Sequence, residues 1–214
     1  MPLRASIIEY GVGNIQSVVN ACRRLGVDAL VAQDGAALAS QRPDRIILPG
    51  VGAIGEALAN LRRRGFQEVL QALVQDAGTP FLGICVGMQM LAERCEEFGA
   101  HEGLGWIPGT VSRLAPEGSG IRLPHVGWNT LEVRDPADPV LGGLNGQDMY
   151  FVHSYAMRCP EEFVLAYCEY GGRFVAAVRR GHILAVQFHP EKSAALGGQL
   201  LSAFMKEPVC TSAA

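Results

Sequence analysis

The first half of the chain alternates short apolar runs with segments in which apolar residues recur at helical spacing. The runs are apolar throughout, which is typical of strands that are buried on both faces. They predict strands at residues 5–9, 27–32, 45–48 and 80–84. The intervening segments predict helices from Asn14 to Gly26, over residues 55–76 with an interruption near Gly65, and from Gly87 to about Glu93. This alternation indicates a parallel sheet covered by helices on both faces.

The second half of the chain has a different pattern, because short strands separated by Gly-, Pro- and Asp-containing turns replace the strand–helix alternation. These strands are predicted at residues 106–114, 130–133, 148–155, 163–170, 174–179 and 183–188, and a last helix at 193–206. We therefore expect one three-layer α/β domain over residues 1–206. Its largely parallel central sheet gains antiparallel strands late in the chain, and residues 207–214 are expected to form a frayed tail.

The composition excludes several classes of protein. Of the 214 residues, 49% are apolar and 18% are charged, which excludes a disordered chain. The formal net charge is −3 and there is no long run of Lys or Arg, so we expect no nucleic-acid and no membrane-surface partner. The longest uncharged stretch, residues 77–92, is too short and too glycine-rich to span a membrane, and no signal peptide is recognised. We expect a cytoplasmic protein.

The cysteines and glycines refine this picture. Six cysteines are scattered without any CxxC spacing, so we expect free thiols and no metal site. There are 26 glycines, about 12% of the chain against roughly 7% in an average protein. This excess indicates that tight backbone turns matter more in this chain than in an average protein.

One cysteine stands where a strand becomes a helix, between two glycines, in the sequence GICVG (residues 83–87). This is the pattern of a nucleophile elbow, in which the glycines permit a sharp turn that exposes the side chain of Cys85. The helix N-terminus would favour the thiolate, and the N–H of Val86 would be available to an oxyanion. A buried structural cysteine, with glycines serving close packing, is an equally good interpretation of the pentapeptide alone.

A base for this cysteine is available in the sequence QFHPEKS (residues 187–193). An apolar strand ends at His189, Pro190 forces a turn, and the carboxylate of Glu191 is placed where it can fold back to the imidazole. A carboxylate on one ring nitrogen fixes the tautomer and leaves the other to exchange protons with the thiol. A strand-end histidine with a surface glutamate is the simpler interpretation of this segment alone. Because the cysteine elbow lies in the same parallel sheet, the catalytic interpretation of His189 and Glu191 is favoured.

A second oxyanion donor is expected in the glycine loop PGVG (residues 49–52), which directly follows a predicted strand. No Lys-Ser/Thr pair follows this loop, so a nucleotide P-loop is excluded. We assign the second donor to the amides of Val51 and Gly52. We also hypothesise that Gly50 and Gly52 allow the Val51 peptide to flip, so that its N–H reaches the oxyanion only when a partner is loaded.

The motifs GICVGMQ (83–89), PGVG (49–52) and QFHPEKS (187–193) together resemble the class I glutamine amidotransferases with a Cys-His-Glu triad. YGVGNIQSV (10–18), PHVGWN (124–129) and YFVHSY (150–155) are similar to the glutaminase subunits of imidazole glycerol phosphate synthase in that class. The resemblance implies Cys85 as nucleophile, His189 as general acid and base, and Glu191 as its orienting carboxylate. It further implies that glutamine is bound by Gly52, Gln89, His153, Ser154, Tyr155 and Glu97, with Glu96 as the alternative to Glu97.

The resemblance also implies a function. Glutamine would be hydrolysed to glutamate and ammonia through a glutamyl thioester, without metal or cofactor. Ammonia would pass to a separate (β/α)₈-barrel cyclase subunit, in a heterodimer that makes imidazole glycerol phosphate and aminoimidazole carboxamide ribotide. PHVGWN would lie towards that partner, although turn and core packing explain His125 and Trp128 equally well. The alternatives are a glutaminase subunit of another biosynthetic pathway, or a cysteine hydrolase or redox protein of similar fold.

Overall fold

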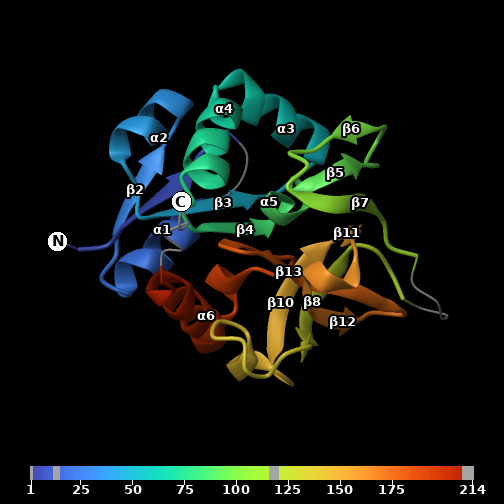
Figure 1. Ribbon diagram of the computed structural model, residues 1–214. Helices are drawn as coiled ribbons and strands as arrows, with labels where there is room; N and C mark the ends of the chain where they lie inside the picture. The colour runs from blue at the N-terminus through green and yellow to red at the C-terminus, as the bar shows by residue number, and fades with distance from the viewer. Residues whose placement is uncertain (1, 12–14, 116–120, 209–214) are drawn as a thin grey trace.

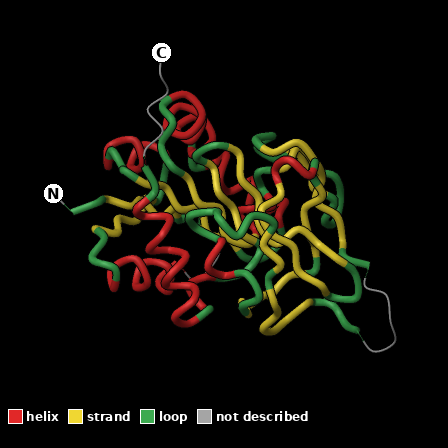
Figure 2. Tube along the Cα trace, turned by 60° about the horizontal axis from the view of Figure 1, so that its bottom comes forward, coloured by secondary structure: helices red, strands yellow, loops and turns green. Residues whose placement is uncertain are grey.

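An eight-stranded sheet crosses the centre of the molecule in this computed structural model, which describes residues 2–11, 15–115 and 121–208 (Figures 1 and 2). The strand order is β2-β1-β3-β4-β14-β13-β12-β9. The strands are β1 (Arg4–Ile8), β2 (Asp28–Ala32), β3 (Arg45–Gly50), β4 (Phe81–Cys85), β9 (Glu132–Val133), β12 (Val164–Glu169), β13 (Arg173–Arg180) and β14 (Ile183–Val186).

The sheet is parallel in one part and antiparallel in the other, as the sequence predicts. Strands β2, β1, β3, β4 and β14 are parallel neighbours, and β13, β12 and β9 continue the sheet in antiparallel pairs. Strand β14 comes late in the chain and nevertheless pairs with β4 in the centre of the sheet. Because this pairing is parallel, the carboxyl end of β14 lies next to the carboxyl end of β4.

Helices cover both faces of the parallel part, so the core strands β3, β4 and β14 are buried along their whole length. Helices α1 and α6 lie on one face, and α2, α3 and α4 lie on the other (Figure 1). The helices are α1 (Ile15–Arg24), α2 (Gly35–Gln41), α3 (Ile54–Arg63), α4 (Phe66–Leu70) followed by a π-helical segment (Gln71–Asp76), α5 (Val86–Gln89) and α6 (Ala194–Lys206). Three-residue 3₁₀ turns lie at Gly142–Leu144, Glu161–Phe163 and Pro190–Lys192.

Two smaller sheets flank the antiparallel part (Figure 1). One has the order β11-β7-β5-β6, and the other is the two-stranded ribbon of β10 and β8. Their strands are β5 (Ala92–Cys95), β6 (His101–Glu102), β7 (Ile107–Arg113), β8 (His125–Thr130), β10 (Asp148–His153) and β11 (Tyr155–Arg158). The ribbon and β11 form one side of the candidate site.

Some predicted boundaries are wrong. The helix predicted from Gly87 to about Glu93 ends at Gln89, and residues 92–95 form β5, which pairs with β7. Ala92 and Cys95 are buried while the residues between them are exposed, so packing against β7 outweighs any local helical preference. The strand predicted at 130–133 covers β9 and only the last residue of β8, so most of β8 was not predicted, and the strand predicted at 148–155 divides into β10 and β11. Helix α2, capped by the Asp34 side chain on the N–H of Ala37 at 2.7 Å, was not predicted.

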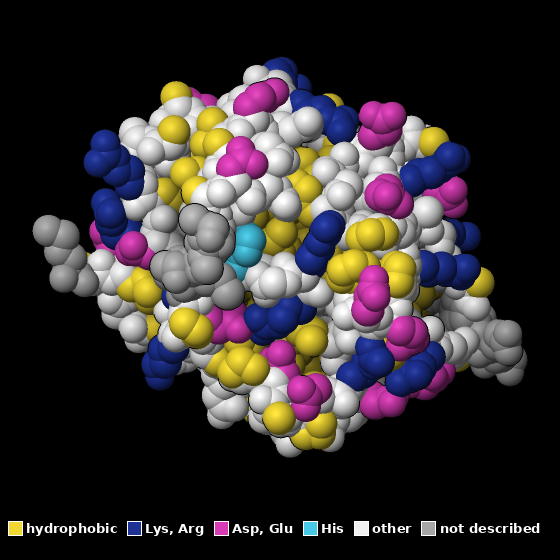
Figure 3. All heavy atoms as spheres, viewed as in Figure 1, with side chains coloured by type: hydrophobic (Ala, Val, Ile, Leu, Met, Phe, Trp, Pro, Cys, Tyr) yellow, Lys and Arg dark blue, Asp and Glu magenta, His cyan; other side chains and the backbone are white. Residues whose placement is uncertain are grey.

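Within the described ranges no helix is both long enough and apolar enough to cross a bilayer. On the face shown in Figure 3, basic and acidic side chains are interspersed and neither sign forms a broad patch. Of the predicted tail, residues 209–214 lie outside the described residues, and Glu207 forms an ion pair with Arg179 at 2.6 Å.

Candidate active site

Three neighbouring parallel strands bring the predicted chemistry to one edge of the sheet. Strand β3 ends at Gly50 and β4 ends at Cys85, and these two residues are paired in register. Strand β14, on the other side of β4, ends three residues before His189. Because the carboxyl ends of parallel strands meet at one edge, the glycine loop, the cysteine and the histidine become neighbours there.

Cys85 forms the sharp turn expected of a nucleophile elbow. Its backbone has φ +54° and ψ −109°, a conformation that residues with a side chain rarely adopt and that costs about 1–3 kcal/mol. A Cβ on Gly87 would lie 1.9 Å from the carbonyl oxygen of Leu48, and one on Gly83 would lie 2.8 Å from that of Gly87. The two flanking glycines are therefore required by the close approach of the backbone on both sides of the cysteine.

His189 is held by a buried carboxylate. A short 3₁₀ turn that begins at Pro190 returns Glu191 to the imidazole, and its Oε1 lies 2.8 Å from Nδ1 of His189. Burial lowers the pKa of His189, but hydrogen bonds with Cys85 and Glu191 outweigh this effect and raise it to about 9. The imidazole is therefore protonated at neutral pH, paired with the carboxylate on one side and the sulfur on the other.

A cavity of about 140 Å³ opens beside the sulfur of Cys85. Its lining contains every predicted site residue except Glu191, which lies behind His189. The lining residues are Val51, Gly52, Cys85, Val86, Gln89, Glu97, Val152, His153, Ser154, Tyr155, His189 and Lys192. The cavity thus combines a nucleophile, a protonated imidazole and two backbone segments with amide donors, which suits acyl transfer.

The glycine loop at the end of β3 depends on glycine for two different reasons. Gly52 has φ +85° with open space around its Cβ position, so conformation alone demands glycine there. At Gly50 a Cβ would lie 2.4 Å from the hydroxyl of Tyr10 and 2.8 Å from Cβ of Val86. Close packing of this loop against the start of α5 therefore brings the Val51 and Gly52 segment to the cavity.

The structure separates the two neighbouring glutamates. Glu97 lines the cavity, and its Oε2 accepts a hydrogen bond of 2.7 Å from the N–H of Ile54 at the start of α3. Glu96 lies on the surface, where it pairs with Arg94 at 3.4 Å. Only Glu97 is in a position to meet a ligand in the cavity, and its contact with the substrate ammonium stays a prediction.

Two residues of QFHPEKS, Gln187 and Lys192, take part in the site although no role was predicted for them. Gln187 is fully buried; its Nε2 donates to Sγ of Cys85 at 3.6 Å and its Oε1 accepts from Nε2 of Gln89 at 3.0 Å. Lys192 lines the cavity, with its ammonium 5.9 Å from the centre of the Tyr150 ring. A polar residue in the otherwise apolar strand before His189 was the available signal for Gln187.

The residues of PHVGWN have opposite environments. His125 is buried, with 2% of its surface exposed, whereas Val126 and Trp128 are 54% and 53% exposed. The alternation of β8 explains this, because neighbouring residues of a strand face opposite sides. Core packing therefore accounts for His125 but not for Trp128.

Comparisons with known proteins agree with this geometry. The family described as "Glutamine amidotransferase class-I" matches residues 6–207. "Imidazole glycerol phosphate synthase subunit HisH" of Rhodopirellula baltica is 44% identical over 205 residues, covering 95% of this chain and 98% of its own. "Imidazole glycerol phosphate synthase subunit HisH 1" of Campylobacter jejuni (strain RM1221) is 43% identical over 201 residues, covering 94% and 98%. A solved "glutamine amidotransferase" shares the fold with a TM-score of 0.72 at 23% identity, covering 94% of this chain and 96% of that one.

Proposed function

The chain belongs to the class-I glutamine amidotransferase family, and we propose that it is the glutaminase subunit of an imidazole glycerol phosphate synthase. Relatives that carry this name are about as long as the chain and align with nearly all of it. The observation that carries the proposal is the conjunction of a strained cysteine elbow with the 2.8 Å His189–Glu191 pair at one cavity.

The reaction begins with attack by the Cys85 thiolate on the side-chain amide carbon of glutamine. The carbonyl oxygen becomes an oxyanion, which accepts hydrogen bonds from the N–H of Val86 and from the Val51–Gly52 segment. Preorganised backbone donors of this kind stabilise charge that develops only in the transition state, and each contributes about 10²–10³-fold in rate. Gln187 donates a hydrogen bond to the sulfur at 3.6 Å and so holds the nucleophile at the cavity.

His189 supplies the protons for both halves of the reaction. Its raised pKa makes it an imidazolium at neutral pH, so it donates a proton to the leaving nitrogen as the carbon–nitrogen bond breaks. Ammonia leaves and a γ-glutamyl thioester on Cys85 remains. The now neutral imidazole accepts a proton from water, which attacks the thioester and releases glutamate. Glu191 holds the ring in one orientation throughout.

The rest of the cavity would hold the amino-acid end of glutamine. Glu97 is the carboxylate for the substrate ammonium, and Gly52, Gln89 and the segment from His153 to Tyr155 line the same cavity. The Nε2 of Gln89 is anchored by the carbonyl oxygen of Tyr155 at 2.9 Å. Such anchoring supports a preformed binding site, which keeps the ordering cost of glutamine low.

A cyclase partner with a (β/α)₈ barrel would take up the ammonia and would dock over the mouth of this cavity. Trp128 and Val126 are exposed on β8, and the Trp128 ring packs against Tyr150, with centroids 5.8 Å apart. The ammonium of Lys192, which lines the cavity, lies 5.9 Å from the centre of the same Tyr150 ring. Tryptophan is enriched at protein interfaces, so the exposed Trp128 marks β8 as a docking surface. We place this heterodimer in the cytoplasm, in line with the absence of disulfides among the described cysteines.

The test is glutamate release from glutamine by the purified chain, with and without the candidate cyclase subunit and its nucleotide ligand. We expect weak hydrolysis alone and strong stimulation by the loaded partner, with Cys85→Ala inactive in both conditions. Mass spectrometry of the quenched reaction should show a glutamyl adduct on Cys85. Equal hydrolysis with and without the partner would contradict the assignment to this synthase, and the lack of an adduct would contradict glutaminase chemistry.

A further inference from the structure

A buried pair of histidines connects strand β8, which carries the exposed Val126 and Trp128, to the cavity beside Cys85. His125 of β8 and His153 of β10 are register partners in the antiparallel ribbon, and both are more than nine-tenths buried. Nδ1 of His125 lies 3.1 Å from Nε2 of His153. His153 lines the cavity, whereas His125 has no access to it. His125 can therefore affect a ligand only through its neighbour.

The hydrogen-bond partners determine which nitrogen carries each proton. Nδ1 of His153 lies 2.9 Å from the carbonyl oxygen of Tyr155, which only accepts, so this nitrogen must donate. Nε2 of the neutral His153 is then an acceptor, and Nδ1 of His125 donates to it. Nε2 of His125 in turn accepts from Nδ2 of Asn129 at 3.4 Å. Burial lowers the pKa of both histidines to about 4, so both rings are neutral at physiological pH.

The chain of hydrogen bonds continues to the nucleophile. The carbonyl oxygen of Tyr155 also accepts from Nε2 of Gln89 at 2.9 Å. The same Nε2 donates to Gln187, which donates to Sγ of Cys85. The side chains of this chain of hydrogen bonds from His125 to Gln187 are buried, and each step has a defined donor and acceptor. The other tautomer of His153 would therefore leave Nδ1 of His153 and the Nδ1–H of His125 unsatisfied.

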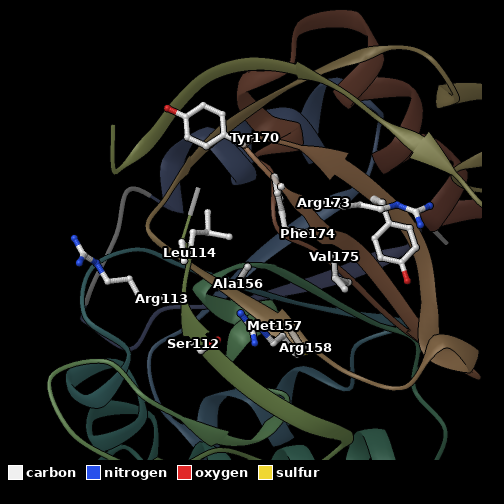
Figure 4. Close-up of a pocket in the computed structure, with 14 residues that line it drawn as sticks. Ser112, Arg113, Leu114, Ala156, Met157, Arg158, Tyr170, Arg173, Phe174 and Val175 are labelled. Atoms are coloured by element: carbon white, nitrogen blue, oxygen red, sulfur yellow. The ribbon is translucent and has the colours of Figure 1, made fainter. Parts of the chain in front are cut away.

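Aromatic packing holds the His125 ring in place. It lies between Phe151, with centroids 5.0 Å apart, and Tyr170, with centroids 3.9 Å apart, and both pairs are nearly parallel. Tyr170 also lines a second cavity of about 160 Å³, together with Phe174, Ala156 and Met157 (Figure 4). Strand β11 thus contributes to both cavities, since its Tyr155 lines the one beside Cys85.

We propose that His125 is a positioning residue for glutamine binding: its Nδ1–H donates to Nε2 of His153 and so holds this ring, in the tautomer that the Tyr155 carbonyl requires, at the wall formed by Tyr155 and Gln89. The kinetic part of this inference rests on the proposed function. The hydrogen bond between His125 and His153 and the stacking of the His125 ring do not depend on that function, because both are formed within the chain itself. The neighbouring Val126 and Trp128 make β8 the element through which a docked partner would reach this wall.

Three variants separate the hydrogen bond from the packing. His125→Asn places an amide donor where Nδ1 stands, His125→Phe keeps a flat stacked ring without any donor, and His182→Phe controls for loss of a histidine elsewhere. His182 contacts the carbonyl oxygen of Val74 and is remote from the cavity lining. We expect His125→Phe to raise KM for glutamine at least about tenfold with a smaller effect on kcat, and His125→Asn to restore most of the loss. Equal KM values for His125→Asn and His125→Phe would overturn the proposal.

The protonation state provides a test that requires neither turnover nor a folded variant. Long-range ¹H–¹⁵N spectra of the isolated wild-type chain should show His125 and His153 both protonated on Nδ1 and unprotonated on Nε2. A proton on Nε2 of His153 would overturn the proposal even if the chain is an active glutaminase. Conversely, a wild-type chain that releases no glutamate with any barrel partner would refute the proposed function, while the spectra would still decide the histidine arrangement.

Discussion

Two histidines line the same cavity from opposite walls, and their environments have opposite effects on their charge. His189 and His153 are 3% and 6% exposed, so burial disfavours the charged form of both. Burial lowers the pKa of His153 to about 4, because the hydrogen bond with the carbonyl oxygen of Tyr155, which raises the pKa, is too weak to offset the loss of solvation. The pKa of His189 rises to about 9, because Glu191 and Cys85 stabilise the imidazolium. Hydrogen-bond partners, rather than burial, decide which histidine carries the reacting proton.

The two walls also differ in how the backbone supports them. The catalytic wall consists of the carboxyl ends of β3, β4 and β14, where glycines permit close approach and Cys85 is strained. The binding wall consists of the β8–β10 ribbon and β11, where side chains in regular strands form the hydrogen-bond chain. Changes in the catalytic wall should therefore mainly affect kcat, whereas changes in the binding wall should mainly affect KM.

The largest effect is expected from removing the charge that distinguishes the two histidines. Glu191→Gln keeps the shape of the side chain but removes one of the groups that raise the pKa of His189. We expect kcat to fall about 10⁴-fold, as for the orienting carboxylate of other triads. Since the raised pKa keeps the wild-type ring protonated until the pH rises through about 9, the variant should lose this proton at a lower pH. NMR titration of His189 measures this change in pKa. An unchanged pKa would contradict the claim that Glu191 gives His189 a different charge from His153.

The catalytic wall could be predicted from the sequence because its signals are local. The elbow needs only the five residues around Cys85, and the turn that joins His189 to Glu191 spans three residues. The strands that end in these motifs were predicted, but their order in the sheet was not. Strand β14 comes late in the chain and pairs with β4 through long-range contacts that no local pattern indicates.

The binding wall could be predicted only in part because its contacts are long-range. His125 and His153 are 28 positions apart, and their pairing depends on the register of a ribbon whose first strand, β8, was not predicted apart from its last residue. Strand β5 is four residues long, and its pairing with β7 cannot be deduced from so short a pattern. Gln187 and Gln89 meet across 98 positions, so no local pattern indicates their contact with each other.

A smaller effect is expected in the glycine loop of the catalytic wall. Gly52→Ala forces a side chain into a backbone with φ +85°, which costs about 1–2 kcal/mol, although nothing obstructs the Cβ itself. The loop should relax away from the geometry that presents its amides, so partner-stimulated glutamate release should fall about 10²-fold. Alkylation of Cys85 should proceed as in the wild type, which would show that the elbow is intact. Full stimulated turnover in this variant would refute the hypothesis that the Val51 peptide flips.

The smallest expected effect concerns Gln187, which belongs to both walls. Its Nε2 donates to the sulfur of Cys85 and its Oε1 accepts from Gln89, so its removal should weaken the nucleophile and loosen the binding wall together. Gln187→Leu, a change to an apolar side chain at a fully buried position, should lower kcat and raise KM by about tenfold each, since one buried hydrogen bond is lost on either side. Gln187→Glu keeps the acceptor for Gln89 but places a carboxylate beside the sulfur, so KM should be restored while kcat stays low. If both variants change only kcat, Gln187 acts on the nucleophile alone, and the hydrogen-bond chain from His125 does not extend to the sulfur.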